Sequence, residues 1–563
     1  MLALVGVAVY LPGLSAIPPV DRDESRFAQA SRQMLESVTL PEVERDPDLH
    51  GGGLAVPRVA GTPRLKKPPL IYWLQAGSAW VFTGSDALRD AIWMYRVPSA
   101  LAALIASIVT WRIARTMMSA RAALLAGVML AVCPMVVWDA HQARADQLLL
   151  ACTTIAMGAL WHIWRTRDAD RIGWGAPMVL WIATGAGLMT KGVTPLIVLG
   201  AVIWLSVVAR RWRWIWRTKP IVGVAIVALM VAPWVYAVAQ QVGWSAYWSV
   251  IFDETAGRSA GVKEGHWGPP GYHTVLSAAL FWPGSLLTLA AFGAAWAGAG
   301  ILAPRNARPF FGSLASRWRE RTIADDASAF LIAWIVPGWV FFELISTKLP
   351  HYTMPIYPAL ALVTARALDD WIAPTDAAKP ARPPMVGALI WGLIGLAWVG
   401  TAPVAAAELL DGPVVPAIIG AVIAGLGVIL AVRHIARNNL ARAHTLAIAS
   451  AVVFAITLLG AVLPNLNRVW VSPRLAEHLP PDAPVGAVGY HEDSLVFLTR
   501  GRLERLGNDA GPAWLDANPE GVLVVPVGVV DSLGPVEVIA QVSGLNYSNG
   551  DAVDLRIVRR RDD

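Results

Sequence analysis

Residues 17–37, IPPVDRDESRFAQASRQMLES, directly follow the first apolar run and change the character of the chain from apolar to charged. Pro18 and Pro19 end a membrane helix, because proline lacks the backbone N–H that a continuing helix needs. Asp23 and Glu24 come next, and by local pattern they serve equally well as catalytic acids or as the N-cap and first-turn acid of a helix. The helix that follows is amphipathic and able to lie where lipid meets water, which favours a membrane-surface enzyme. Its apolar face holds Phe27, Ala30, Met34 and Leu35, and its polar residues are Arg26, Gln29, Arg32 and Glu36.

Composition indicates a membrane protein. Of the 563 residues, 56% are hydrophobic and 15% are charged, whereas soluble domains carry about 25% charged residues. The 27 tryptophans also fit a membrane protein, because tryptophan rings gather at the level of the lipid headgroups. The net charge of +6 is spread over short loops between apolar runs, which argues against nucleic-acid binding. Cys133 and Cys152 fall inside apolar runs and are expected to be free thiols.

Apolar runs of spanning length predict about thirteen transmembrane helices. The first run lacks a basic flank and a small-residue cleavage site, so we expect it to be a retained helix. The expected spans are residues 1–19, 93–117, 119–138, 144–164, 174–190, 192–209, 219–240, 271–302, 327–346, 351–373, 384–404, 412–432 and 443–463.

Every second loop between these spans is basic, which sets the expected orientation. RRWRWIWRTK at 210–219 is the most basic of the early loops, and the intervening short loops hold few cations. By the positive-inside rule the basic loops are cytoplasmic, so the loop carrying Asp23 and Glu24 is outside. An odd number of helices places the C-terminus outside as well.

From about residue 465 the composition changes to short β-rich runs separated by Gly, Pro and Asp. SPRLAEHL at 472–479 predicts a short helix, and the expected strands are VGAVGY, LVFLT, GVLVVPVGVV, VEVIAQV and VDLRIV. We therefore expect two domains: a transmembrane domain over 1–464, with interfacial helices in its outer loop 20–92, and an extracytoplasmic α/β domain over 465–563.

Topology leaves a short set of charged residues on the outer side, each with a structural alternative. Lys66 and Lys67 precede two prolines and fit snorkelling side chains as well as ligand binding. Arg144 and Asp146 fit a structural ion pair equally well. Cations at tight turns between membrane helices are costly and point to an anionic substrate. Lys191 in TKG and Lys348 in TKLPHY occupy such turns.

Several motifs occur in one order along the chain: DRDESRFAQASRQMLES, RLKKPPLIYWLQAGSAWVFTG, RVPSALAA, ARADQLLLACTT, LMTKGVTPLIV, STKLPHYTMPIYPALAL and, near the end, NYSNGDAVDLRIVRR. In this order the chain resembles the GT-C glycosyltransferases of the protein O-mannosyltransferase and aminoarabinose (lipid A) transferase superfamily, and the latter most. The resemblance implies a GT-C fold that transfers a sugar, with inversion, from a polyprenyl-phosphate carrier. It also implies a multi-pass protein of the bacterial inner membrane with a periplasmic active site and C-terminus.

The resemblance, taken together with the set of outer charged residues, implies three sets of site residues. The catalytic carboxylates are Asp23, Asp146 and Glu24. The donor phosphate is bound by Lys67, Lys191, Arg258, Lys348 and Tyr352. The residues that bind the acceptor or support the site are Arg26, Lys66, Arg144 and His351.

A divalent metal fits this sequence poorly. Relatives often read EKP where this chain reads KKP, so that Lys66 replaces a glutamate associated with metal or acceptor binding. The candidate metal ligand is His266, and a histidine in the Gly/Pro-rich KEGHWGPPG loop is more often a solvated residue than a ligand. A divalent metal is therefore disfavoured but stays open, with His266 as its candidate ligand.

The favoured function is transfer of a polyprenyl-phosphate-linked sugar to an envelope acceptor such as lipid A or another glycan, by a protein expected to be a monomer. A protein acceptor, as in the O-mannosyltransferases, stays open, and the sugar is not indicated. One alternative is a transporter or flippase of lipid-linked sugars, which would place ionisable groups at mid-membrane. Another is a structural subunit of an envelope assembly, which leaves the outer charges unexplained.

Overall fold

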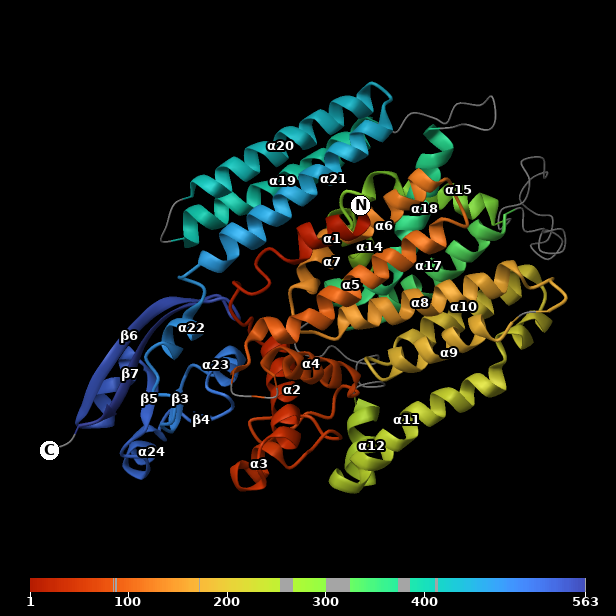
Figure 1. The fold of residues 1–563 in the computed structure, drawn as a ribbon. Coiled ribbons are helices and arrows are strands. Elements are labelled where there is room, and N and C mark those ends of the chain that lie inside the picture. Colours follow the sequence, from red (N-terminus) through yellow and green to blue (C-terminus); the bar gives the residue numbers. More distant parts are fainter. Residues whose placement is uncertain are drawn as a thin grey trace.

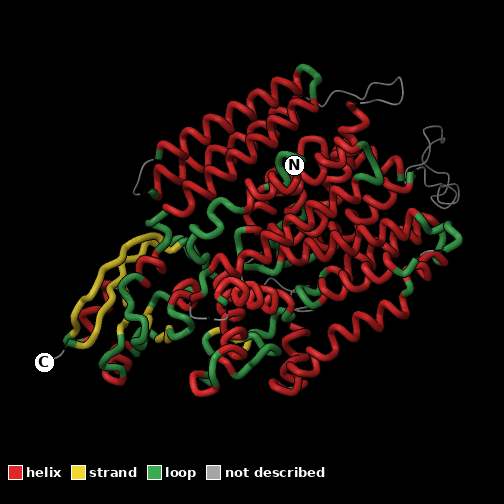
Figure 2. The backbone as a smooth tube through the Cα atoms, viewed as in Figure 1, coloured by secondary structure: helices red, strands yellow, loops and turns green. Residues whose placement is uncertain are grey.

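The structure is a computed structural model that describes the chain except residues 85, 87, 88, 172, 254–266, 300–324, 373–384, 411–413, 562 and 563. A bundle of long helices forms most of the molecule, and helices α2 and α4 of the first long loop lie between one end of it and a small C-terminal domain (Figure 1). Figure 2 shows that most of the strands are gathered in that small domain.

The bundle is assembled from helices in chain order. Its first half consists of α1 (Leu2–Tyr10), α5 (Ile92–Ala114), α6 (Ala120–Val132), α7 (Pro134–Ala140), α8 (Asp146–Arg165), α9 (Gly175–Leu188) and α10 (Thr194–Ala209). Its second half consists of α11 (Pro220–Val242), α14 (Tyr272–Leu280), α15 (Ser285–Gly298), α17 (Asp326–Leu344), α18 (Tyr357–Ile372), α19 (Met385–Leu409), α20 (Val415–Ala436) and α21 (Leu440–Thr457).

Each expected span contains a helix, but many of these helices are short. Among the described residues, seven helices are long and apolar enough to cross a membrane, or eight if α6 and α7, bent by 56° at Pro134, form one span. Three more apolar helices, α9, α10 and α15, are shorter. Proline accounts for the bend, because it removes a backbone hydrogen bond. The protein is thus polytopic and helical, and the count of thirteen spans stays a prediction.

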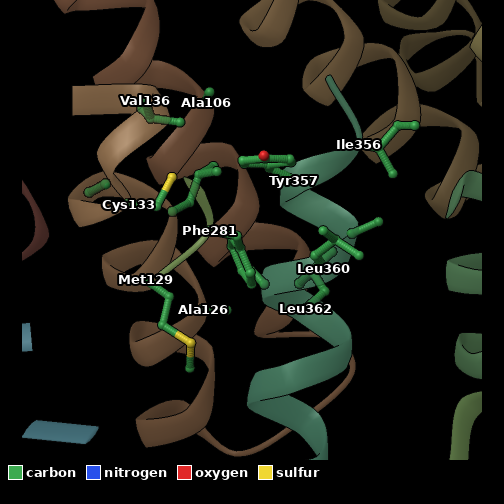
Figure 3. Close-up of a cluster of buried hydrophobic side chains, with 14 of the residues drawn as sticks. Ala106, Ala126, Met129, Cys133, Val136, Phe281, Ile356, Tyr357, Leu360 and Leu362 are labelled. Carbon is green, nitrogen blue, oxygen red and sulfur yellow. The ribbon is translucent and has the colours of Figure 1, made fainter. Parts of the chain in front are cut away.

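Small side chains hold the bundle together. Figure 3 shows Ala106 of α5 and Ala126 and Met129 of α6 in a buried cluster that also includes Phe281 and, from α18, Leu360. Alanine and glycine let helices approach closely, which increases their dispersion contacts. These contacts matter in a membrane, because the hydrophobic effect does not drive helices together there. The two cysteines are buried and free, as expected.

The first long loop forms α2 (Asp23–Thr39), α3 (Pro47–His50), a hairpin of β1 (Arg58–Val59) and β2 (Thr62–Pro63), and α4 (Leu70–Thr83). Helix α2 is amphipathic, as the sequence predicts, yet both of its faces are covered. Arg32 pairs with Asp90 at 2.7 Å, and Glu36 pairs at 2.5 Å with Arg500 of the C-terminal domain. The polar face of α2 is therefore a docking surface for that domain.

The C-terminal domain is a mixed sheet in the order β4-β3-β5-β7-β6. Strand β3 is parallel to β4 and β5, whereas β7 is antiparallel to β5 and β6. Its elements are α22 (Val471–Ala476), β3 (Val485–Val488), α23 (Asp493–Leu498), β4 (Leu503–Leu506), α24 (Gly511–Ala517), β5 (Val522–Pro526), β6 (Val536–Asn546) and β7 (Asp551–Arg560).

One element of this domain was wrongly predicted from the sequence. LVFLT, expected as a strand, forms most of α23, whereas β4 lies in the LERL segment that follows it. A short continuous apolar run does not distinguish a buried strand from a buried helix. Asp493 and Ser494 begin this helix directly before the run, as residues that favour helix N-termini do. The helix expected in SPRLAEHL is confirmed as α22.

Candidate active site

A cavity of about 1010 Å³ opens where the bundle, the first loop and the C-terminal domain meet. Its wall carries six cationic side chains against three carboxylates, so that the cavity attracts anions. The cations are Arg26, Arg64, Lys66, Lys67, Lys191 and Arg505, and the carboxylates are Asp23, Asp146 and Asp493.

Asp23 is the first residue of α2 and faces this cavity. Its side chain is 51% exposed, and its carboxylate lies 3.4 Å from Arg64 Nη2 and 3.7 Å from Arg144 Nη2. Burial opposes ionisation of Asp23, but the charges of Arg144, Arg64 and Lys191 outweigh it and lower its pKa to about 2. Asp23 is therefore an ionised carboxylate at neutral pH, accessible from the cavity.

Asp146 is the second carboxylate of the cluster and begins α8. Lys191 Nζ donates to its Oδ1 at 2.6 Å, Arg144 Nη2 lies 3.5 Å from its Oδ2, and His351 Nε2 lies 3.7 Å from Oδ1. Arg144 thus bridges Asp23 and Asp146. The Arg144–Asp146 ion pair, which the sequence left as an alternative, is present, and it belongs to a network rather than to an isolated helix start.

Lys191 is held by the turn between α9 and α10. Gly192 has a φ of +80°, a left-handed conformation that favours glycine. The N–H groups of Lys191 and Gly192 both donate to the carbonyl of Gly187, at 3.0 and 3.3 Å. The ammonium of Lys191 lies 5.4 Å from the centre of the Tyr352 ring, a cation–π distance. Lys191 and Tyr352 line the cavity together.

Glu24 lies away from the cavity, in the protein interior. Its carboxylate accepts N–H groups of Arg96 at 2.8 Å on both oxygens, and also the backbone N–H groups of Val20 and Ala143, each at 2.8 Å. Its side chain is fully buried. These contacts describe a structural ion pair that fixes the start of α2, which argues against the catalytic role that we expected for Glu24.

Lys348 is also placed apart from the cavity wall. It is buried, and its Nζ donates to the carbonyl of Gly268 at 2.9 Å. Its neighbours Thr347 and Leu349 line the cavity instead. This position argues against the expected contact between Lys348 and a donor phosphate, and indicates that it anchors the segment around Gly268.

The remaining expected residues divide by location. Arg26, Lys66 and Lys67 line the cavity, as does His351. Arg258 and His266 lie outside the described residues. Among the residues that are described, no three His, Cys, Asp or Glu side chains are grouped as metal ligands are.

Three charged residues of the cavity wall were missed. Arg64 lies between β2 and Lys66, and its charge, two residues before the KKP motif, could have drawn attention to it. Asp493 and Arg505 belong to the C-terminal domain. They reach the cavity because this domain packs against a segment that lies several hundred residues earlier in the chain. Local sequence carries no signal of such a contact.

One side of the cavity is apolar and borders the bundle. Aromatic and aliphatic side chains from the α9–α10 turn, from α11 and α12 (Trp244–Phe252), and from the end of α17 form this wall. They are Leu188, Met189, Val193, Leu196, Val231, Trp234, Val235, Tyr247, Trp248, Val250, Ile251, Phe341, Phe342 and Ile345. A chain with an anionic head and a hydrocarbon tail fits such a cavity.

Sequence comparison identifies relatives of this chain. The family described as dolichyl-phosphate-mannose-protein mannosyltransferase matches residues 66–236. The undecaprenyl phosphate-alpha-4-amino-4-deoxy-L-arabinose arabinosyl transferase of Erwinia tasmaniensis is 28% identical over 352 residues, 61% of this chain and 54% of that protein. Its counterpart in Serratia proteamaculans is 28% identical over 407 residues, 70% of this chain and 63% of that protein. The chain thus spans less than two thirds of the length of these relatives.

Structural comparison extends the likeness to nearly the whole chain. The crystal structure of ArnT from Cupriavidus metallidurans bound to undecaprenyl phosphate superposes with a TM-score of 0.72 at 19% sequence identity, covering 99% of this chain and 96% of that one. At this identity the match establishes a common fold. The chain therefore has the fold of this ArnT, and its sequence is similar to those of the aminoarabinose transferases and, over residues 66–236, to the protein mannosyltransferase family.

Proposed function

We propose that this protein transfers a sugar from a polyprenyl-phosphate donor to an envelope acceptor such as lipid A or another glycan, with inversion at the anomeric carbon. The observation that carries the proposal is the cavity itself, in which an apolar wall and a cation–carboxylate cluster face the same space. The relatives named for undecaprenyl phosphate-linked aminoarabinose support this donor class.

The donor would lie with its hydrocarbon tail along the apolar wall. Trp234 of α11, Trp248 of α12 and Phe342 of α17 represent the three helices that form most of this wall. The phosphate would then meet Lys67 and Lys191 at the end of the wall. Charge-assisted hydrogen bonds from these ammonium groups are strong enough to hold a phosphate in place.

The transfer step needs a leaving phosphate and an oriented acceptor. The acceptor oxygen forms a bond to the anomeric carbon while the bond from that carbon to the phosphate oxygen breaks, and its electron pair stays on the polyprenyl phosphate. Lys191 and Lys67 would stabilise the growing negative charge there. The low pKa of Asp23, about 2, makes it a weak base. Asp23 would therefore chiefly orient the acceptor and take its proton late in the transfer.

The proposed orientation places this cavity on the extracytoplasmic side. Lys191 and Arg210 flank the two ends of α10, whose 16 residues span about 24 Å. The basic loop that follows thus lies at the opposite end of the bundle from the cavity. Cysteine introduced at the exposed Asn549 should react with an impermeant thiol reagent in intact cells, whereas one at the exposed Arg213 should not. Reaction at Arg213 alone would overturn the orientation.

Lys191→Ala tests the donor site. Loss of one charge-assisted hydrogen bond costs about 1.5–3 kcal/mol, which is roughly tenfold to a hundredfold in transfer rate. Lys219→Ala is the matched control, because Lys219 lies beyond the other end of α10 and stacks on Trp174 at 5.1 Å. The measurement is release of polyprenyl phosphate together with glycosylated acceptor. Equal losses in both variants would show that Lys191 is a structural anchor.

A further inference from the structure

Two arginines from different domains are held side by side in the cavity wall. Arg26 of α2 pairs through Nε with Asp493 Oδ2 at 2.7 Å, and Arg505 of the C-terminal domain pairs through Nη2 with Asp493 Oδ1 at 2.8 Å. The Asp493 side chain is only 5% exposed, whereas Arg26 and Arg505 are 42% and 39% exposed. One buried carboxylate thus fixes two guanidinium groups that both remain open to the cavity.

Arg26, Asp493 and Arg505 form a triad whose charges do not balance. One carboxylate neutralises one of the two guanidinium groups, so that a net charge of +1 remains at this part of the cavity wall. Each guanidinium carries five N–H donors in a planar fork that matches carboxylate and phosphate geometry. Because both oxygens of Asp493 are already engaged, the donors that face the cavity are suited to an oxyanion from outside the protein.

The triad is fixed close to Asp23. Arg26 follows Asp23 by three residues on α2, which is about 4.5 Å along the helix axis and places both on one face. The N–H of Ser494, next to Asp493, donates to Asp21 Oδ1 at 2.7 Å. The start of α23 is therefore tied to the segment that leads into Asp23.

We propose that Arg26 and Arg505 form an acceptor subsite that binds a phosphate or carboxylate group of the acceptor, near the oxygen that receives the sugar. This inference rests on the proposed function and adds to it two residues, one from each domain, that would select the acceptor. It also gives the C-terminal domain a role in selecting the acceptor, since Arg505 reaches the cavity only when that domain is docked. Arg26 and Arg505 are binding residues here, and Asp493 is a positioning residue.

Binding without turnover tests the subsite independently of transfer. The probe is a diphosphorylated glucosamine disaccharide, and its dephosphorylated form is the comparison. The full-length protein in detergent should bind the phosphorylated probe at least about tenfold more tightly than the neutral one. Arg505→Ala should remove most of that preference, and Arg505→Lys should restore only part of it, because an ammonium keeps the charge and loses the fork.

Arg559→Ala is the matched control, since Arg559 forms an exposed pair with Glu537 at 2.8 Å on the outer hairpin β6–β7. It should keep the full preference for the phosphorylated probe. Binding of polyprenyl phosphate should be the same in all the variants, which shows that the cavity is intact. An unchanged preference in Arg505→Ala with intact polyprenyl phosphate binding would reduce the triad to an interdomain ion pair and overturn the proposal. Inorganic phosphate that binds as tightly as the disaccharide would overturn it as well, because the site would then not recognise an acceptor.

The two proposals can fail separately. A protein that prefers the phosphorylated disaccharide through Arg505 but transfers no sugar would refute the proposed function and leave an anion-binding site. A protein that transfers sugar equally well to phosphorylated and neutral acceptors, with no effect of Arg505→Ala on the acceptor KM, would refute the subsite alone.

Discussion

Replacement of Glu24 by glutamine separates structure from chemistry in the acidic pair. Each oxygen of Glu24 accepts one N–H from Arg96 and one backbone N–H, from Ala143 on Oε1 and from Val20 on Oε2. In Glu24→Gln one oxygen becomes an NH₂ group. Whichever way the amide turns, this group faces two donors and makes neither hydrogen bond.

The expected cost follows from these contacts. One lost bond is charge-assisted, worth about 1.5–3 kcal/mol, and the unsatisfied backbone N–H adds about 1–3 kcal/mol. The Arg96 guanidinium also keeps its charge in a fully buried site without a counter-charge. Breaking a buried pair in this way costs about 3–5 kcal/mol in total. We therefore expect Glu24→Gln to lower the free energy of unfolding by about that amount.

The protein contains its own probes for this measurement. Cys133 and Cys152 are buried, so that a thiol-reactive dye reports unfolding of the bundle in detergent as denaturant is added. Glu537→Gln is the control, because the exposed pair of Glu537 with Arg559 contributes less than about 1 kcal/mol. A Glu24→Gln protein with wild-type stability and a large loss of transfer would refute the structural role and return Glu24 to catalysis.

Two further predictions concern the neighbouring carboxylates. Asp23→Asn should still fold and lose about a hundredfold or more in transfer, because the carboxylate that orients the acceptor and takes its proton is gone. Wild-type activity should show no Asp23 titration between pH 5 and 9, because the pKa of Asp23 is about 2. Burial raises the pKa of Asp21 to about 6 from an ordinary 3.8. Between these two pH values the folded state therefore binds more protons than the unfolded state does. Stability should therefore fall as pH rises from about 4 to 6, and Asp21→Asn should flatten that slope; an identical slope in the variant would contradict this assignment.

Asp23 and Lys191 could be assigned to the site because their motifs resemble those of known glycosyltransferases, whereas local pattern alone left Asp23 equally suited to begin a helix. Asp23 follows a helix-stopping proline pair, and Lys191 is a cation at a tight turn between apolar helices. Glu24 shows where such reasoning ends. Successive residues of a helix are rotated by about 100°, so that Asp23 faces the cavity while Glu24 faces the core, and local composition does not say which is which.

Contacts between distant segments could not be predicted from one chain. Arg505 reaches the cavity only because the C-terminal domain docks on α2, through pairs such as Arg500 with Glu36. The pattern of LVFLT misled for a related reason, since burial on all sides removes the periodicity that separates a helix from a strand. The bundle was easier to predict, because apolar runs of spanning length carry their own signal.

The central claim is that the cavity takes a sugar donor linked to a polyprenyl phosphate, and donor competition tests it most directly. The purified protein would be given a radiolabelled polyprenyl-phosphate sugar or the corresponding nucleotide sugar, each with a lipid A acceptor. We expect labelled acceptor and free polyprenyl phosphate in equal amounts from the lipid-linked donor, and no product from the nucleotide sugar. Turnover of the nucleotide sugar without a lipid carrier would contradict the proposal.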